Sequence, residues 1–315
     1  MDIIFFGSSH FGLPSLKALI AAGHKISCVV TQPDKKQGRG MGIGKTAIKE
    51  FAQDNGLEIH QPQDVNSPES SVFLKKLHPE LFVVIAYGQL LSPQLLDIPA
   101  IMPLNTHASL LPFYRGAAPI NWAIINGEAR TGVTIIKMAE KMDAGPVIAA
   151  KETAIGPNDD FFSMETKLSG LGAALLVETI AAVAANNYRI SAQDENKATF
   201  APKLKKEDGQ ISWQRPAKEI FNLVRGLSGW PAAFTYYNGK SVKIIKASIS
   251  GRIDGSAACL PGEIISVSPP GIEVAAKDGN LLIEILQIEG KRQMTAQEFT
   301  AGHKISPGER LSDRK

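Results

Sequence analysis

The sequence predicts an α/β protein in which a doubly wound, mostly parallel sheet of the Rossmann type precedes a small β-barrel of the oligonucleotide-binding type. Over residues 1–189, short apolar runs alternate with segments of helical spacing, which indicates parallel strands joined by right-handed crossovers. Over residues 208–315, the apolar runs are separated by tight-turn residue pairs, which is typical of antiparallel hairpins. The polar stretch between them, residues 190–207, is predicted to be a linker.

The first domain starts with an apolar run at residues 2–6 that ends at Gly7. Helical spacing then runs from Pro14 to Gly23, because proline suits a first turn and glycine ends a helix. The first turn, Gly7-Ser-Ser-His-Phe-Gly12, lacks the GxGxxG of dinucleotide binders and argues against a nicotinamide oxidoreductase. Further strands are expected at residues 25–30, 57–61, 81–87, 102–109 and 131–139, and further helices at 46–54, 67–77 and 118–126.

The second domain is expected to begin with a short helix at Pro216–Leu227 and to continue as hairpins. An Asn-Gly pair lies within residues 233–246, and an Asp-Gly pair lies within residues 272–288. Both pairs favour the turns that join antiparallel strands. Several short strands in so short a segment indicate a small barrel.

Charge gives a weak indication of the partner. The net charge is +3 and the pI is about 8.7. Residues 205–315 hold 16 Lys and Arg against 12 Asp and Glu, whereas the rest of the chain holds 18 against 19. Positive charge in the last third points to a polyanionic partner, although an ordinary solvated surface accounts for the counts more simply.

The expected compartment is the cytoplasm. Cys28 and Cys259 form no CxxC motif, which argues against a disulfide scaffold or a zinc ribbon and fits a reducing compartment. The N-terminus shows no signal pattern, and the most apolar helical stretch, Ala173–Ala185, is interrupted by Glu178 and is too short to span a bilayer. The histidine spacing matches no metal site, so no metal is expected.

The densest group of chemically capable residues is NTHASLLPFYRGAAP at 105–119. Asn105 and His107 lie two apart at the end of a predicted strand and so share a face, at the edge where open α/β sheets bind ligands. Asp143 follows another strand and could orient and charge an imidazole. These three groups, with no Ser or Cys nucleophile, suit a transfer in which the acceptor itself attacks. A core histidine, a turn-forming Asn and a helix-capping Asp remain an open alternative.

Two further candidates have simpler explanations. His10, in the first turn, could line the same crevice but is expected to be a loop residue. The Asp159-Asp160 pair resembles a catalytic pair of carboxylates, but it precedes a helical pattern and is expected to cap that helix.

These motifs are similar to those of the 10-formyltetrahydrofolate-dependent formyltransferases. Within that superfamily the chain resembles the methionyl-tRNA formyltransferase family over essentially its whole length. The superfamily resemblance rests on Asn105–Pro112, on residues 115–119 and on the Asp143-x-Gly motif. The narrower resemblance rests on TQPDKKQGRG at residues 31–40 and on TFAPKL at residues 199–204.

The resemblance implies a Rossmann-like formyltransferase domain followed by a tRNA-binding barrel, in a monomer. It implies that 10-formyltetrahydrofolate, as a co-substrate, gives its formyl group to the α-amino group of methionyl-initiator tRNA, which yields N-formylmethionyl-tRNA for translation initiation. Asn105 and protonated His107 would stabilise the oxyanion, His107 would also carry the proton, and Asp143 would orient the imidazole. The implied folate contacts are Ser109, Leu110, Leu111, Pro112, Ile85, Tyr87, Gly88, Gln89 and Leu90.

The stretch DKKQGRGMGIGKT at residues 34–46 ends like the phosphate loop of nucleotide hydrolases. Arg39 stands where that loop needs its first glycine, and the stretch follows the second strand rather than the first. A mobile basic loop fits better, and in the family the equivalent insertion reaches the acceptor end of the tRNA. The expected tRNA contacts are Lys35, Lys36, Arg39, Lys45, Lys205 and Lys206, with further lysines at Lys203, Lys240, Lys243 and Lys246.

Two other functions stay open at this point. Another 10-formyltetrahydrofolate-dependent formyltransferase or hydrolase, acting on a small-molecule acceptor, would share the Asn-His-Asp core. A non-catalytic RNA-binding module would bind tRNA without formyl transfer. The basic loop and the full-length barrel favour tRNA as the acceptor.

Overall fold

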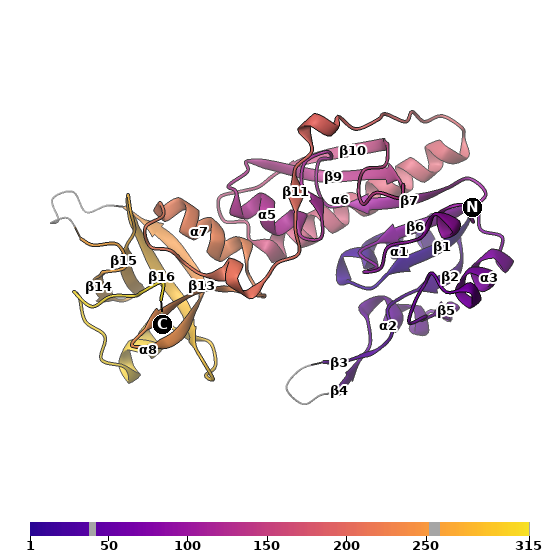
Figure 1. Cartoon of the computed structure of the whole chain (residues 1–315). Helices are drawn as coiled ribbons and strands as arrows, with labels where there is room; N and C mark the ends of the chain where they lie inside the picture. The colour runs from indigo at the N-terminus through magenta and orange to yellow at the C-terminus, as the bar shows by residue number, and fades with distance from the viewer. Residues whose placement is uncertain (38–41, 252–258, 315) are drawn as a thin grey trace. The chain divides into compact units, whose positions relative to one another are not determined.

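The computed structural model describes residues 1–37, 42–251 and 259–314 (Figure 1). They form two compact units, each described by itself below. The first unit comprises Met1–Pro119, Arg130–Ala154 and Glu165–Pro202. The second comprises Ile120–Ala129, Ile155–Met164 and the residues from Lys203 onward.

The first unit is built on a seven-stranded sheet with the strand order β10-β9-β7-β6-β1-β2-β5 (Figure 1). The five strands β5, β2, β1, β6 and β7 pair parallel to one another. Strand β9 pairs antiparallel with β7, and β10 pairs antiparallel with β9. The predicted α/β sheet is confirmed. Its strands are β1 (Asp2–Gly7), β2 (Lys25–Val30), β5 (Ile59–His60), β6 (Leu81–Ile85), β7 (Met102–His107), β9 (Arg130–Lys137) and β10 (Val147–Ala154).

The pairing of β9 departs from the parallel pattern expected of strands that alternate with helices. Residues His107 and Thr134 lie opposite each other in an antiparallel ladder. A crossover helix must return the chain along the whole preceding strand, and a six-residue strand such as β7 spans about 20 Å. Helix α5 (Pro119–Ile125) has seven residues and spans only about 10 Å. Strand β9 begins beside the carboxyl end of β7 and runs back along it.

The helices of the first unit begin where the sequence provides caps. Thr46, Ser67 and Ser92 each accept a backbone N–H in the first turn, and a proline opens two of the helices. The helices are η1 (His10–Gly12), α1 (Leu13–Ala21), α2 (Ala47–Asp54), α3 (Pro68–Lys76), α4 (Pro93–Leu96), η2 (Glu195–Lys197) and most of α6 (Phe161–Ala184). Four short strands complete the unit: β3 (Lys35–Gln37), β4 (Gly42–Gly44), β8 (Arg115–Gly116) and β11 (Phe200–Ala201).

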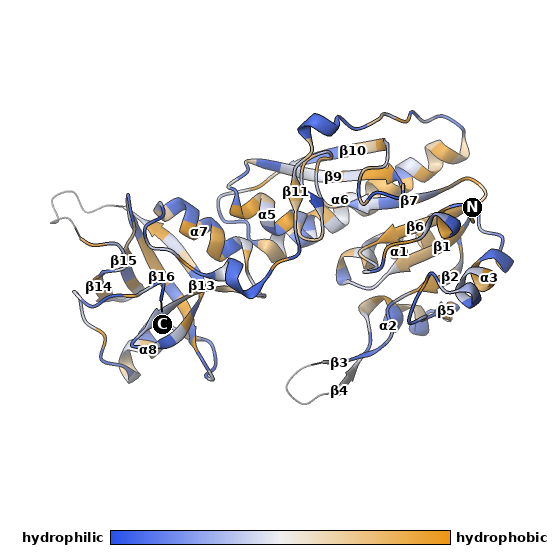
Figure 2. Ribbon diagram, in the orientation of Figure 1, coloured by the Kyte–Doolittle hydropathy of each residue, from blue (hydrophilic) through white to orange (hydrophobic). Residues whose placement is uncertain are grey.

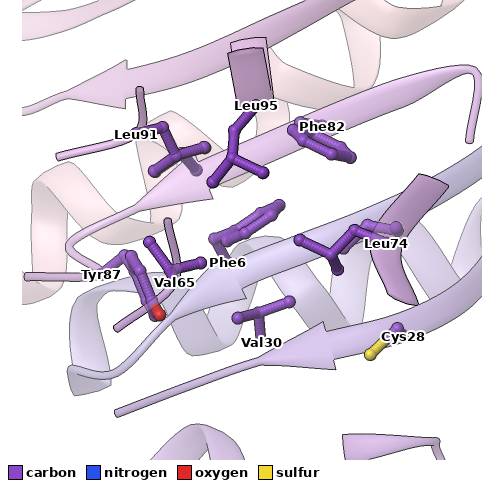
Figure 3. Packing of buried hydrophobic residues seen from close by; sticks show 11 residues of the cluster. Phe6, Cys28, Val30, Val65, Leu74, Phe82, Tyr87, Leu91 and Leu95 are labelled. Carbon is purple, nitrogen blue, oxygen red and sulfur yellow. The ribbon is translucent and has the colours of Figure 1, made fainter. Parts of the chain in front are cut away.

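A compact hydrophobic cluster covers one face of the parallel strands (Figure 3). The rings of Phe6 and Phe82 lie 4.8 Å apart, and Tyr87 meets Phe6 edge-on. Each such fully buried side chain stabilises the fold by about 1.5–3 kcal/mol, and Figure 2 shows these strands as mainly hydrophobic. Cys28 is fully buried here, and burial raises the pKa of its thiol to about 12, so it acts as a small core residue.

Helix α6 is longer than the apolar stretch Ala173–Ala185 indicates. It runs for 24 residues with a mean hydropathy of 1.5 over its most apolar window, enough by length and composition to cross a membrane, and half of that window is buried. Ser169 donates a 2.8 Å hydrogen bond to the carbonyl of Phe11, which places the helix against the first turn of the fold. Ser163 donates its backbone N–H to Asp160, which confirms the predicted capping role of that residue.

The second unit carries an antiparallel sheet of the order β12-β13-β16-β15-β14, with β17 paired to β16. Asn238 and Gly239 have φ angles of +49° and +72°, as the predicted hairpin turn requires. The predicted small barrel-like domain is confirmed. Its elements are η3 (Lys206–Gly209), α7 (Ala217–Gly226), β12 (Ala233–Tyr237), β13 (Lys240–Ser250), β14 (Ile264–Ser268), β15 (Gly271–Ala275), β16 (Asn280–Ile288), β17 (Met294–Thr295) and α8 (Ala296–Gly302).

Candidate active site

The candidate site lies at the carboxyl end of β7. Asn105 and His107 are two residues apart on this strand, so their side chains lie on the same face of the sheet. Asn105 is partly exposed, whereas His107 is buried. The neighbouring parallel strand β6 ends at the same edge, where ligands bind in open α/β sheets.

Asp143 meets both of these side chains from the turn that follows β9. One carboxylate oxygen, Oδ2, lies 3.6 Å from Nδ1 of His107 and accepts a 2.8 Å hydrogen bond from the backbone N–H of Gly116. The other, Oδ1, accepts a 3.4 Å hydrogen bond from the amide of Asn105. Only 12% of the Asp143 side chain is exposed. The structure therefore brings together the amide, the imidazole and the carboxylate that the sequence singled out.

The hydrogen bonds of His107 identify the role of each ring nitrogen. Nε2 lies 2.9 Å from the carbonyl oxygen of Tyr114. A carbonyl only accepts, so Nε2 carries a proton and donates it. In the neutral ring Nδ1 is then the free base, and it faces Asp143 at a distance that permits an ion pair but exceeds an ordinary hydrogen bond. Nδ1 is thus the nitrogen that can gain and release a proton.

The turn after β7 is held by its own polar groups. Ser109 is fully buried and donates a 2.6 Å hydrogen bond to the carbonyl of Phe113. Thr134 of β9 donates to the carbonyl of Ser109 and accepts from the N–H of Leu111. Ser109 therefore shapes the turn, while the partly exposed side chains of the expected folate contacts Leu110, Leu111 and Pro112 remain accessible.

The second segment of expected folate contacts, residues 85–90, offers mainly backbone to a ligand. The side chains of Ile85 and Tyr87 are 0% and 2% exposed and belong to the core. Gly88 has a φ of +94°, a left-handed conformation that turns the chain outward. Gln89 is bonded to the neighbouring loop through the N–H of Val65 and the carbonyl of Gln63, and Leu90 is 60% exposed.

The basic stretch after β2 forms a hairpin in which β3 and β4 pair antiparallel. This hairpin stands between β2 and α2, so the chain has no direct strand-to-helix phosphate loop there. Lys35 is exposed, and Lys45 is exposed with a 2.9 Å hydrogen bond to Gln53. Lys49 is paired with Asp34 at 2.6 Å. Arg39 and the side chain of Lys36 lie outside the described residues.

In the second unit the expected tRNA contacts Lys205 and Lys206 are exposed, as are Lys203 and Lys240. Strand β13 carries a bulge between Ile244 and Lys246, which shifts the alternation of its side chains. Lys243 and Lys246 consequently line the same groove, of about 740 Å³, together with Phe162, Phe221 and Arg225. Lys246 is paired there with Glu284 at 2.7 Å.

Two residues at the site, Gln193 and Glu195, were not identified from the sequence, and Arg115, which lies in the stretch 105–119, was given no role there. Arg115 is buried, and its guanidinium binds Gln193 and Glu195 from the stretch that resembled a linker. Hydrogen bonds from Arg115 and Lys141 lower the pKa of the Glu195 carboxyl to about 2. No local pattern marks Gln193 or Glu195, because their partner Arg115 lies 78 and 80 residues away in the sequence. Among the residues that the structure describes, no group of three or more His, Cys, Asp or Glu could hold a metal ion.

Family models match both units. The model described as formyl transferase matches residues 1–180, and the model described as formyl transferase, C-terminal domain, matches residues 203–304. The chain is 42% identical to a methionyl-tRNA formyltransferase of Geobacter metallireducens, over 99% of this chain and 98% of the relative. It is 45% identical to one of Thermodesulfovibrio yellowstonii, over 97% of each. The chain belongs to the methionyl-tRNA formyltransferase family.

Solved structures share the fold of this family member. A sugar 3N-formyl transferase, WlaRD, aligns with a TM-score of 0.66 at 19% identity, over 93% of this chain and 99% of that chain. HypX from Aquifex aeolicus, in complex with tetrahydrofolic acid, aligns with a TM-score of 0.62 at 17% identity, over 94% of this chain and 46% of that chain. At such low identity, these likenesses concern the fold alone.

Proposed function

We propose that this family member transfers the formyl group of 10-formyltetrahydrofolate to the α-amino group of methionyl-initiator tRNA, giving N-formylmethionyl-tRNA for translation initiation. The observation that carries the proposal is the match to methionyl-tRNA formyltransferases at 41–45% identity over nearly the whole chain. The contact of Asp143 with Asn105 and His107 supports it.

The donor supplies an electrophilic formyl carbon on a nitrogen, and the chain's own side chains provide the rest of the chemistry. The amide of Asn105 donates a hydrogen bond to the formyl oxygen as negative charge builds on it. Such a donor, held in place before the reaction, typically contributes 10²- to 10³-fold in rate. Asp143 keeps the amide turned toward the site by accepting its other N–H.

His107 handles the proton. Its Nδ1 takes the proton from the attacking amine and returns it to the departing nitrogen, so that a carbon–nitrogen bond forms as another breaks and no net proton is consumed. The carbonyl of Tyr114 fixes the ring by accepting from Nε2. The carboxylate of Asp143, 3.6 Å from Nδ1, stabilises the imidazolium while it exists.

The residues bordering the site fit a flat, partly apolar donor. Leu90, Phe113 and Met142 are exposed apolar side chains, at 60%, 44% and 50%, and each stands one or two residues from a group described above. Apolar walls with a few fixed polar groups are typical of sites for such ligands. We propose that Leu90 and the 110–112 turn hold the donor, with the backbone of residues 85–89 supplying polar contacts.

The basic side chains suit the tRNA. We propose that residues 1–189 carry the transfer, that residues 190–207 connect the two parts, and that residues 208–315 bind tRNA, in a cytoplasmic monomer. Exposed lysines such as Lys35, Lys45 and Lys205 attract phosphates without needing fixed geometry. Arg39 and Lys36 belong to the same proposed contact surface.

The test is transfer of a labelled formyl group to charged initiator and elongator methionine tRNAs, with small amines as competing acceptors. The proposal expects rapid, saturable labelling of methionyl-initiator tRNA, slower labelling of the elongator tRNA, and none of the small amines or of uncharged tRNA. Labelling of a small amine instead would establish the small-molecule transferase. Binding of tRNA without any transfer would establish an RNA-binding module.

A further inference from the structure

The stretch from Gln193 to Ala201, here called the strap, is bonded along its length to the loops that hold the candidate site. We propose that the strap is a positioning element for the transfer reaction and that Gln193 is its central residue, acting through the backbone of Asp143. This inference rests on the proposed function and adds Gln193 to the residues that serve it.

Gln193 fastens the turn that carries the acid. Its amide nitrogen donates to two carbonyls, that of Asp143 at 2.7 Å and that of Gly145 at 2.6 Å. Asp143 has a φ of +52°, a left-handed conformation that is uncommon outside glycine and that Asp adopts more readily than most residues. These two hydrogen bonds hold the backbone of the turn that carries Asp143, and Lys141 of the same turn also donates to Glu195 of the strap at 3.0 Å.

A buried arginine fixes Gln193 in turn. The Arg115 side chain is 1% exposed, and it donates to the amide oxygen of Gln193 through Nε at 3.0 Å and Nη2 at 2.7 Å. It also binds both carboxylate oxygens of Glu195, at 2.7 and 3.1 Å. A buried guanidinium needs partners, because an unpaired charge there is strongly unfavourable. The amide of Gln193 therefore has one orientation, with its nitrogen toward Asp143.

The other end of the strap holds the chain that orients the imidazole. Thr199 accepts the N–H of Tyr114 on its hydroxyl and the N–H of Arg115 on its carbonyl, each at 2.9 Å. Tyr114 supplies the carbonyl that binds His107. The next residue, Gly116, donates to Asp143, and its α-carbon packs so closely on Ala201 that a Cβ there would lie 2.6 Å from the carbonyl oxygen of Ala201.

The strap thus holds both backbone segments on which the orientation of the imidazole and the carboxylate depends. A displacement of about 1 Å in a reacting group can cost on the order of 10²-fold in rate. Replacement of Gln193 should therefore lower kcat. The amide oxygen and nitrogen of Gln193 are already bonded to Arg115, Asp143 and Gly145, so we expect neither KM to change much.

The experiment compares Gln193→Ala with Lys197→Ala, a matched control on the same strap whose side chain is 67% exposed. We expect Gln193→Ala to lower kcat by about 10- to 100-fold, with the KM for methionyl-tRNA and the KM for the formyl donor each within about twofold. Lys197→Ala should keep kcat within about twofold. A folded Gln193→Ala protein with wild-type kcat would overturn the proposal.

A second variant separates the two ends of the amide. Gln193→Glu keeps an acceptor for Arg115 but places a carboxylate oxygen against the carbonyls of Asp143 and Gly145. It should be about as slow as Gln193→Ala. Wild-type kcat in Gln193→Glu would show that the contact with the acid's turn is dispensable, and it serves as the test if Gln193→Ala fails to fold.

A double-mutant cycle tests whether Gln193 acts through Asp143. In an Asp143→Ala background, Gln193→Ala should change the residual kcat by less than about twofold, because the group that it positions is gone. A full additional loss in that background would mean a general structural effect and would contradict the proposal. The wild type is assayed in parallel. If the wild type transfers no formyl group, the proposed function is wrong; if it does and Gln193→Ala matches it, the role of the strap is wrong.

Discussion

The candidate site and the basic hairpin of the same unit are built in opposite ways. The Asp143 carboxylate is 12% exposed, accepts hydrogen bonds from Gly116 and Asn105, and lies 3.6 Å from Nδ1 of His107. Lys45 is exposed and has one hydrogen bond, to Gln53. Stabilising a developing charge requires fixed groups in a site shielded from water, whereas attraction to phosphates is long-ranged and tolerates mobile side chains. The difference predicts that changes at the site affect kcat and that changes in the hairpin affect KM.

The largest effect is expected from His107→Ala. Loss of the proton carrier and of a cationic neighbour for the oxyanion should lower kcat by about 10³-fold. Binding of methionyl-tRNA, measured by filter retention, should stay within about twofold. His78→Asn is the control, because His78 is exposed, has a φ of +47° that asparagine tolerates, and takes no part in the site. Weaker tRNA binding by His107→Ala would contradict the proposed separation of catalysis at the candidate site from tRNA binding at the hairpin.

Asn105→Ala should have a somewhat smaller effect. One hydrogen-bond donor to the oxyanion is lost, so kcat should fall by about 10²-fold or more, with the KM for the formyl donor little changed. Steady-state kinetics with both substrates varied would measure this. A raised KM at unchanged kcat would mean that Asn105 binds the donor rather than stabilising charge, and the assignment of its role would be wrong.

Removing two hairpin lysines should act on KM alone. Lys35→Ala combined with Lys45→Ala should raise the KM for methionyl-tRNA several-fold. The slope of log K for tRNA binding against log salt concentration should become shallower by about 0.9 for each phosphate contact that is lost. Lys75→Ala combined with Lys76→Ala is the matched control, since both lysines are exposed on α3, away from the hairpin. An unchanged KM and salt slope in the hairpin variant would remove these lysines from the contact surface.

The smallest effect concerns stability at low pH. Two carboxyls have a pKa lowered to about 2, Glu195 by Arg115 and Lys141, and Glu298 by Arg292. A carboxyl whose pKa is lower in the folded protein than in the unfolded chain, where it is about 4.5, stabilises the fold at pH values above 4.5. This contribution is lost as the pH falls towards 2. Denaturant unfolding of Glu195→Gln and of Glu298→Gln should each show a shallower loss of stability over that interval.

Activity distinguishes the two carboxyls. Glu195 belongs to the strap, so Glu195→Gln should also lower kcat modestly at neutral pH, whereas Glu298→Gln, which lies at the start of α8, should not. Equal kcat values in the two variants would mean that the ion pair of Glu195 with Arg115 contributes to stability alone.

Much of the fold could be predicted because it is encoded locally. The apolar run at residues 2–6 became β1, and the Asn238-Gly239 pair set a hairpin because both residues tolerate positive φ. The antiparallel return of β9 could not be predicted, since an apolar strand pattern does not encode the direction in which the strand pairs. Helix α6 was underestimated because its first turns are less apolar than its end.

The candidate site shows the same division. Asn105 and His107 share a face because of strand alternation, which the sequence reveals. Asp143 could also be predicted, because it follows a buried strand. Gln193 was missed because nothing near it in the sequence is apolar enough to signal burial, and its partners Arg115 and Asp143 lie 78 and 50 residues away. Polar networks between distant segments are therefore the part of a site that local patterns do not report.

The most direct test of the account is the single-turnover rate of formyl transfer, with enzyme in excess and both substrates saturating. This measurement isolates the chemical step from tRNA recognition. We expect a rate about 10³-fold below wild type for His107→Ala and a rate within about twofold of wild type for Lys35→Ala combined with Lys45→Ala. A folded His107→Ala protein that transfers the formyl group at the wild-type rate would contradict the account.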